Sequence, residues 1–313
     1  MREIRLPLKE PFRISSGLVR ERPILLLELT ERSGATAWSE CVAMELPNYT
    51  AETTDTARLA LREWLAPRVL GREFHGPQEV AAVLAENIRG HNMAKAAVEM
   101  GCWGMAAEMQ RVPLAGLLMV DANSAYTLAD ADHLAELDEF NLIMLEQPLG
   151  DDDLVRHAQL QKRLSTRICL DESITSVERA EDMITLGSGK IINIKPGRVG
   201  GFSASIAIHD ICRRAEIPVW CGGMLESGIG RAYNVALASL PNFSLPGDLS
   251  PSARYWARDI VTPEWTMNSE GMVHVPRERP GIGVDVDSDM IESLSLRTEV
   301  LTAKSVARQR SPV

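Results

Sequence analysis

The chain has 313 residues, with 33 Lys+Arg against 43 Asp+Glu, which gives a formal net charge of −10. This acidic balance argues against a nucleic-acid partner, because phosphate binding requires a basic surface. No stretch approaches the roughly 18 continuous apolar residues of a membrane span, and no apolar signal-peptide core is visible. Five scattered cysteines are typical of free thiols, so we expect a cytoplasmic protein with neither a membrane nor a nucleic-acid partner.

The first 110 residues are expected to form an α+β unit. Residues 23–30 are apolar, and residues 35–41 alternate between apolar and polar after a Ser33-Gly34 turn, which together predict a β-hairpin. Helical patterns follow at residues 51–65, 77–88 and 92–109.

From Leu117 onward the pattern changes to short apolar runs that each end in a charged residue. The runs LLMVDAN, LIMLEQP, RICLDES and IINIKPG place Asp121, Glu146, Asp171 and Lys195 at intervals of 25, 25 and 24 residues. Helices are expected between them at residues 130–137, 152–164, 177–186 and 202–215. A strand-plus-helix period near 25 is typical of a βα unit, and five or six copies in series favour a (β/α)-barrel over a doubly wound sheet. The chemistry of such a barrel lies at the C-terminal ends of its strands.

Three of these strand-end residues are carboxylates. Asp121, Glu146 and Asp171 would repel one another at one barrel mouth unless a cation neutralised them. An all-oxygen ligand set with room for water and substrate favours Mg²⁺ over Ca²⁺, and no histidine or cysteine lies beside it to suggest zinc. The alternative is that acidic residues simply surround the mouth and pair with arginine.

Lys195 ends the next strand in a chain that has only six lysines. A lysine can lose its proton, whereas an arginine effectively cannot, so Lys195 is a candidate general base. The alternative is a structural ion pair with Asp171 or Glu172. A phosphate-binding loop at residues 186–190 (LGSGK) is rejected because the spacing of the full motif is missing.

These motifs also carry a family resemblance. VDAN, EQP, DES and IKPGRVGG, at these spacings, resemble the enolase superfamily, in its muconate-lactonising and mandelate-racemase-like group. WCGGMLESGIGRA and LPGD, with HNMAKAAVEM and PFRISSG earlier, resemble the o-succinylbenzoate synthase / N-succinylamino acid racemase family. The resemblance covers about residues 5–285 and implies an α/β fold, a (β/α)-barrel of the enolase type with an N-terminal α+β capping domain.

The change of pattern along the chain predicts the domain limits, and the resemblance implies that the C-terminal segment returns to the cap. We expect the capping domain at residues 1–110 and an incomplete barrel with about six visible βα units at residues 111–250. Residues 251–313 would return to the cap and then end in an unstructured tail from about Asp287.

The resemblance assigns the site residues one by one. It makes Asp121, Glu146 and Asp171 the ligands of Mg²⁺, with Mn²⁺ as a possible substitute, and it places Lys195 on one face of the substrate. A loop at residues 12–19 would close over the pocket. The other expected site residues are Glu172 and Asn123 near the metal ligands, and Ser16, Gly223, Met224, Leu225 and Glu226 around a succinyl group. For Met224 and Leu225, the alternative is plain core packing.

The implied reaction is Mg²⁺-dependent removal of a proton α to a carboxylate. Dehydration would give o-succinylbenzoate, a step of menaquinone biosynthesis, and reprotonation on the opposite face would instead racemise an N-succinylamino acid. The implied partner is a small carboxylate substrate with a succinyl group, and a homo-oligomer is expected in this family. An alternative hypothesis, from another class of function, is a catalytically inactive remnant that still binds Mg²⁺.

One part of the family pattern is missing. The family carries a Lys-x-Lys motif on the second barrel strand, yet this chain has no lysine between Lys95 and Lys162. From Val112 to Asp248 there are 137 residues, against a usual minimum of about 200 for an eight-stranded barrel. We therefore expect that two βα units are absent, which at a period near 25 residues is roughly 50 residues or more. We also expect that catalysis is severely impaired.

Overall fold

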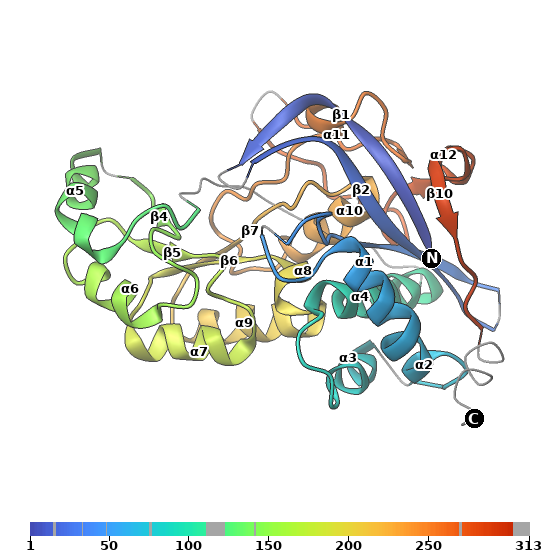
Figure 1. Ribbon diagram of the computed structural model, residues 1–313, viewed down its shortest axis with the longest axis horizontal. Helices are drawn as coiled ribbons and strands as arrows, with labels where there is room; N and C mark the ends of the chain where they lie inside the picture. Colours follow the sequence, from blue (N-terminus) through green and yellow to red (C-terminus); the bar gives the residue numbers. More distant parts are fainter. Residues whose placement is uncertain are drawn as a thin grey trace.

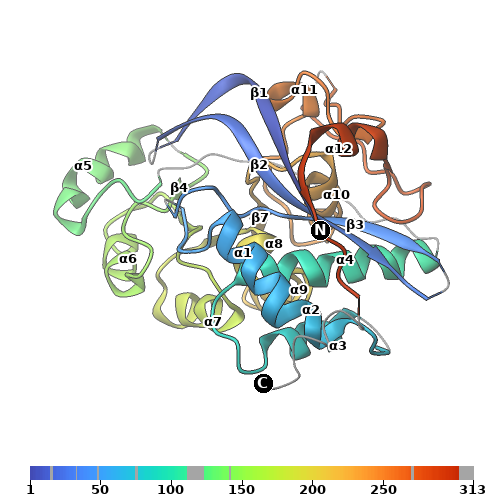
Figure 2. The ribbon, with the colours of Figure 1, turned by 45° about the vertical axis from the view of Figure 1, so that its right-hand side comes forward.

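The structure, a computed structural model, describes residues 1–14, 17–32, 34–47, 49–74, 77–110, 123–140, 142–268 and 271–302. These residues contain an antiparallel four-stranded sheet, a parallel four-stranded sheet and a two-stranded sheet. Figure 1 shows the antiparallel strands β1 (Arg2–Ile14) and β2 (Gly17–Thr30) arching over one side of the parallel sheet. Helices α6 (Leu154–Gln161), α7 (Val177–Leu186) and α9 (Phe202–Arg214) cover the opposite side of that sheet, as both ribbon views show (Figures 1 and 2).

The antiparallel sheet belongs to the part of the molecule that we call the cap. Its strand order is β10-β1-β2-β3. Pairing of Thr30 with Thr36 confirms the predicted hairpin. Phe12 pairs with Val19, so the predicted loop at residues 12–19 consists largely of strand; its expected site residue Ser16 lies outside the described residues. The strands are β1 (Arg2–Ile14), β2 (Gly17–Thr30), β3 (Thr36–Cys41) and β10 (Ser295–Thr298).

The cap helices follow the predicted pattern with shifts at their ends; the helix expected at residues 77–88, for example, ends at Ala85. The helix expected from residue 51 begins at Thr54, because the Thr53 hydroxyl accepts a hydrogen bond from the Thr56 amide and so caps the first turn. The continuous pattern at residues 51–65 is also divided between an α-helix and a π-helical turn. The cap helices are α1 (Thr54–Ala60), η1 (Leu61–Leu65), α2 (Ala66–Val69), α3 (Pro77–Ala85) and α4 (Asn92–Gln110).

The parallel sheet holds the predicted strand ends. Backbone hydrogen bonds extend it on both edges: Ser124 donates to the Gln147 carbonyl (2.7 Å), and Asp248 donates to the Cys221 carbonyl (3.1 Å). The described strands and the helices outside them form part of a (β/α)-barrel. Its strands are β4 (Leu145–Glu146), β5 (Ile168–Leu170), β6 (Ile191–Ile194) and β7 (Val219–Cys221).

The barrel helices separate these strands as the 25-residue period predicted. Residues 130–137, expected as one helix, are instead divided between 3₁₀ and α turns. The helical elements are η2 (Leu128–Asp130), α5 (Ala131–Ala135), η3 (Glu136–Phe140), α6 (Leu154–Gln161), α7 (Val177–Leu186), α8 (Pro196–Val199), α9 (Phe202–Arg214) and α10 (Gly228–Leu237).

Side chains alternate between the two faces of the parallel strands. Ile192 and Ile194 belong to the large core shared with the helices. The other face of the sheet carries a separate buried cluster of Cys169, Ile191 and Trp220, one each from β5, β6 and β7, and of Met144, which directly precedes β4. Because successive side chains point to opposite faces, the residues two positions further along the chain extend this inner face. Those residues are Glu146, Asp171, Asn193 and Gly222.

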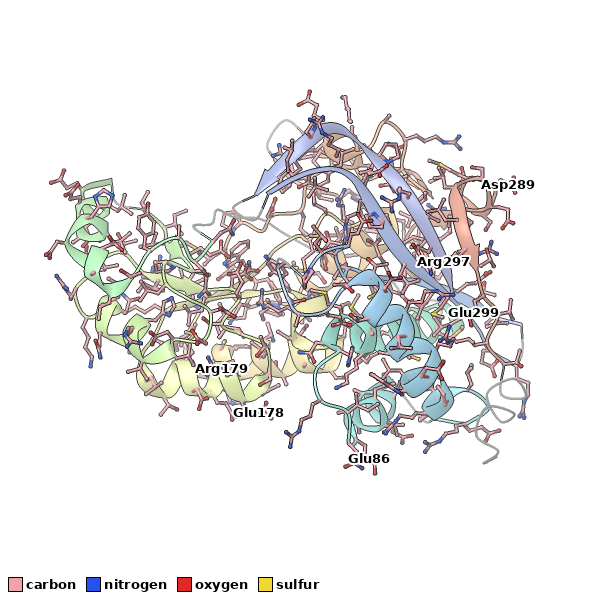
Figure 3. All side chains as sticks on the ribbon, in the orientation of Figure 1. Glu86, Glu178, Arg179, Asp289, Arg297 and Glu299 are labelled. Atoms are coloured by element: carbon pink, nitrogen blue, oxygen red, sulfur yellow. The ribbon has the colours of Figure 1, made fainter. Side chains whose placement is uncertain are left out.

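The C-terminal residues fold back onto the cap. Here the expected unstructured tail from about Asp287 is wrong, because β10 pairs with β1. Arg297 donates to Glu3 (2.6 Å) and to Asp55 (3.0 Å), and Glu299 accepts from Arg58 (2.8 Å), which fixes β10 at the sheet edge (Figure 3). The remaining elements are α11 (Ser252–Tyr255), β8 (Val261–Thr262), β9 (Asp285–Val286) and α12 (Ser288–Leu294).

Among the residues that the structure describes, no helix combines the length and the hydropathy needed to cross a membrane.

Candidate active site

Three of the predicted site residues lie at the ends of adjacent parallel strands. Glu146 is the last residue of β4, Asp171 follows β5, and Lys195 follows β6. Their exposed fractions are only 1%, 0% and 7%. Burying these charges is costly unless they are paired and hydrogen-bonded, so their partners decide what the site can do.

Lys195 faces the carboxylate of the neighbouring strand. Its Nζ donates to Asp171 Oδ2 (2.7 Å) and lies 3.2 Å from the hydroxyl oxygen of Tyr49, a cap residue. The same Nζ lies 5.2 Å from the centre of the Tyr49 ring, a cation–π geometry. The ion pair considered from the sequence is therefore present, and it faces the inner side of the barrel.

Arg198 is a site residue that the sequence analysis did not single out. Pro196 begins α8 directly after Lys195, and the single turn brings Arg198 back to the other oxygen of Asp171. Its guanidinium also donates to the carbonyls of Ile174 (2.7 Å) and Asn193. Burial lowers the pKa of Arg198, yet an arginine keeps its charge. The sequence feature that could have indicated Arg198 is its position three residues after the strand-end lysine.

Two buried carboxamides join the strand ends to one another. Gln147 Oε1 accepts from the Asp171 amide (2.9 Å), and its Nε2 donates to the Ser173 hydroxyl (2.9 Å), which ties the EQP segment to the DES segment. Asn193 donates to Glu146 Oε1 (2.8 Å) and accepts from the Gly222 amide (2.8 Å). The signal for Asn193 was a polar residue inside the apolar run IINIK.

The carboxylates suit a hard cation by their chemistry. Glu146 and Asp171 offer anionic oxygens from adjacent strand ends, which is the donor type that Mg²⁺ prefers. Within the described ranges, no three His, Cys, Asp or Glu side chains gather closely enough to hold a metal ion. Asp121, the third predicted ligand, lies outside those ranges. Glu172 is half-buried next to Asp171, and Asn123 is half-buried beside the segment that pairs with Gln147.

The predicted succinyl-binding segment forms a tight turn after β7. Met224 and Leu225 are buried in apolar clusters, so both contribute to packing in this structure. Glu226 accepts from the Met224 amide (2.8 Å) and from Asn234 Nδ2 (2.7 Å), which holds the turn in shape. Gly223 leaves no room for a side chain, because an added Cβ would lie 2.7 Å from the Asp248 carbonyl oxygen.

Unusual backbone conformations gather around these strand ends. Positive φ angles occur at Asn123 (49°), Ser124 (58°), Gln147 (34°) and Leu225 (55°), none of which is a glycine. Such conformations cost of order 1–3 kcal/mol each and persist where the surrounding structure holds them, which is common at active sites.

The cap lies directly against this mouth. The Asn92 side chain donates to the carbonyls of Thr175 (3.2 Å) and Arg198 (3.0 Å). An added Cβ at Gly197 would lie 2.5 Å from Val42 of the cap, so the two parts approach closely beside Lys195. A substrate between them would be shielded from water, which strengthens the electrostatic interactions of the site.

Comparison with known proteins matches both parts of the chain. A family described as "Enolase C-terminal domain-like" matches residues 79–290. A second, described as "Mandelate racemase / muconate lactonizing enzyme, N-terminal domain", matches residues 1–118.

Curated relatives match over nearly their full length. The o-succinylbenzoate synthase of Bacillus subtilis (strain 168) is 41% identical, with 94% of this chain and 95% of that protein covered. The N-succinylamino acid racemase of an Amycolatopsis species is 40% identical, with 97% of both covered. A crystal structure of an enolase superfamily member from Listeria innocua superposes with a TM-score of 0.90 at 36% identity, covering 95% of this chain and 96% of that one.

The same alignments show a large internal difference in length. The alignment with the Bacillus subtilis protein extends over 356 positions, whereas 94% of 313 residues is about 294. About 60 aligned positions therefore lie opposite no residue of this chain. At the observed period of about 25 residues, this corresponds to roughly two βα units.

Proposed function

We propose, since this chain belongs to the enolase superfamily, that its site is built to remove a proton α to the carboxylate of a succinylated substrate. The o-succinylbenzoate synthase reaction is the main candidate. The observation that carries the proposal is the convergence of Glu146, Asp171 and Lys195 at adjacent strand ends, with Lys195 Nζ 2.7 Å from Asp171. The names of the closely similar relatives support this substrate class.

Each residue then has a role. A bound Mg²⁺ would supply positive charge beside the substrate carboxylate, where negative charge develops as the proton leaves. Asp121, Glu146 and Asp171 would hold this ion, and Mn²⁺ could replace it. Lys195 in its neutral form would take an α-proton from its own face of the substrate. In the dehydration, loss of the β-hydroxyl as water would follow removal of the α-proton. The turn at residues 223–226, with Ser16 of the cap, would enclose the succinyl group.

Arg198 and Tyr49 would support the lysine. Arg198 supplies a permanent positive charge to Asp171, so that carboxylate is not left uncompensated when Lys195 is neutral. Tyr49 presents its hydroxyl and its ring to the same Nζ, which restricts where the amine can lie.

We further propose that catalysis in this chain is severely impaired. The roughly 60 unmatched positions would include the second barrel strand, with the Lys-x-Lys motif of the family. Lys95, the last lysine before the region of the missing motif, donates to the Ile88 carbonyl within the cap (2.7 Å) and is therefore no clear substitute. The site would then keep Lys195 on one face of the substrate, but it would lack the lysine that, by resemblance to the family, is the main base of the synthase reaction.

The test is to restore the missing units. A two-unit insert with a Lys-x-Lys strand, placed between Leu117 and Val120, should raise synthase turnover at least 100-fold, which is the usual contribution of a positioned base. The matched control carries the same insert with both lysines replaced by methionine and should remain inactive. Turnover of the present chain in the ordinary enzyme range of about 1–1,000 per second would refute the impairment.

Racemisation of N-succinylamino acids is the second candidate. It is supported by racemases of the same family that are 40% and 37% identical to this chain. Paired assays of the restored chain with both substrates separate the two activities. A Mg²⁺-binding remnant without proton transfer is the third candidate, and it predicts metal binding with no α-proton exchange. A cytoplasmic homo-oligomer is part of the proposal, and five free cysteines support a reducing compartment.

A further inference from the structure

We infer that Asn193 is a positioning residue, which holds the Glu146 carboxylate in the orientation that a metal ion requires. This inference rests on the proposed function, because that proposal makes Glu146 a ligand. Asn193 itself touches neither the proposed ion nor the reacting atoms; it acts through Glu146.

The position of Asn193 on its strand is the first argument. Ile191 and Asn193 of β6 and Lys195, which follows that strand, are two residues apart and therefore lie on the same face. Ile191 belongs to the inner cluster of the barrel. Asn193 therefore lies between an apolar layer and the strand-end lysine. It is 1% exposed, and a buried carboxamide is costly unless its donors and acceptors are used.

The orientation of the carboxamide follows from its neighbours. Asn193 Oδ1 accepts from the Gly222 backbone amide (2.8 Å), and a backbone amide is only a donor. The oxygen must therefore face Gly222, which turns Nδ2 toward Glu146 Oε1 at 2.8 Å. The backbone after β7 thus fixes the direction from which Glu146 receives its hydrogen bond.

Gly222 keeps the carboxamide in place from the other side. An added Cβ at Gly222 would lie 2.5 Å from Asn193 Nδ2 and 2.6 Å from the Cε of Lys195. The side chains of Asn193 and Lys195 therefore fill the space that a larger residue would occupy. This packing links the carboxylate of β4 to the base of β6 and to the turn that begins the proposed succinyl pocket.

The test measures the affinity for Mn²⁺, by electron paramagnetic resonance of the free ion, in the full chain. Asn193→Leu removes both hydrogen bonds at similar volume, and Asn193→Ser keeps a small polar group that cannot reach Glu146. Each should raise the Mn²⁺ dissociation constant 10- to 100-fold, which is typical when a hydrogen-bond partner of a metal ligand is lost. The matched control is Asn242→Leu, which removes a carboxamide bonded to the Ile217 carbonyl before β7 (2.8 Å) and should change the constant less than twofold.

A double-mutant cycle separates positioning from general structural damage. In a Glu146→Ala background, Asn193→Leu should change the Mn²⁺ dissociation constant less than twofold, because the carboxylate on which it acts is gone. An equal effect in both backgrounds, an effect of both Asn193 variants below twofold, or an equal effect of Asn242→Leu would overturn the inference. If the unaltered chain binds no Mn²⁺, the proposed metal site fails as well, which is a distinct outcome.

Discussion

The buried Glu40 carboxylate gives the protein a pH-dependent stability that can be worked out from its surroundings. Glu40 lies on β3 of the cap and accepts hydrogen bonds from the Ser227 amide (3.0 Å) and the Gly230 amide (3.3 Å), at the start of barrel helix α10. Burial raises its pKa from 4.5 to about 7, against the opposing effects of the Ser227 hydrogen bonds and the nearby Arg22. Glu40 is therefore a buried carboxylate of this interface whose pKa lies near neutral pH.

The direction of this pH dependence follows from the number of protons that the folded and the unfolded state bind. Between pH 4.5 and 7 the folded state holds the Glu40 proton while the unfolded state has lost it, so rising pH favours unfolding. A shift from 4.5 to about 7 corresponds to about 3 kcal/mol of unfolding free energy, lost as the pH rises through this window. Glu40→Gln removes this titration, whereas its effect on the hydrogen bonds is the same at every pH.

The assay is urea unfolding, followed by tryptophan fluorescence, at several pH values from 4.5 to 8. The unfolding free energy of the unaltered chain minus that of Glu40→Gln should fall by about 3 kcal/mol across this range. Glu86→Gln, at an exposed position after α3 (Figure 3), is the control and should give a constant difference. A constant difference for Glu40→Gln, within about 0.5 kcal/mol, would refute the reasoning.

Three further substitutions test other contacts of the cap and the barrel. Gly201→Ala should lower the free energy of unfolding by about 3 kcal/mol or more in chemical denaturation, because Gly201 has a φ of 117° and an added Cβ would lie 2.1 Å from Glu99. Gly150→Ala is the control and should lower it by less than about 1 kcal/mol. Glu99→Ala should cost about 3–5 kcal/mol by the same measurement, since it leaves the buried donors at the start of α9 without their acceptor, and a cost below about 1 kcal/mol would contradict this. Tyr49→Phe removes the hydroxyl but keeps the ring, so α-proton exchange should slow about fivefold, and an unchanged rate would exclude a role for the hydroxyl.

The strand ends could be predicted from the sequence because the barrel repeats one unit. Each apolar run is short, and each ends in a charged residue, so the period alone placed Glu146, Asp171 and Lys195 at one mouth. The helix at residues 177–186 was located to the residue for a similar reason: Ser176 caps its first turn, and Gly187 ends it with a positive φ of 68°.

The partners of these residues could not be predicted, because they come from contacts between distant segments. Tyr49 reaches Lys195 across 146 residues of sequence, and nothing in the LPNYT segment indicates that approach. The C-terminal tail was misjudged for the same reason. Its polar sequence resembles solvated chain, yet β10 is stabilised by pairing with β1 at the opposite end of the sequence.

We propose that Lys195 removes an α-proton from one face of a succinylated carboxylate. The most direct test of this proposal is deuterium incorporation at the α-carbon of each enantiomer of an N-succinylamino acid, in deuterated water with Mg²⁺. We expect slow incorporation into one enantiomer without inversion, and none with Lys195→Met. Incorporation into neither enantiomer by a chain that binds Mg²⁺, or an unchanged rate in Lys195→Met, would contradict the proposal.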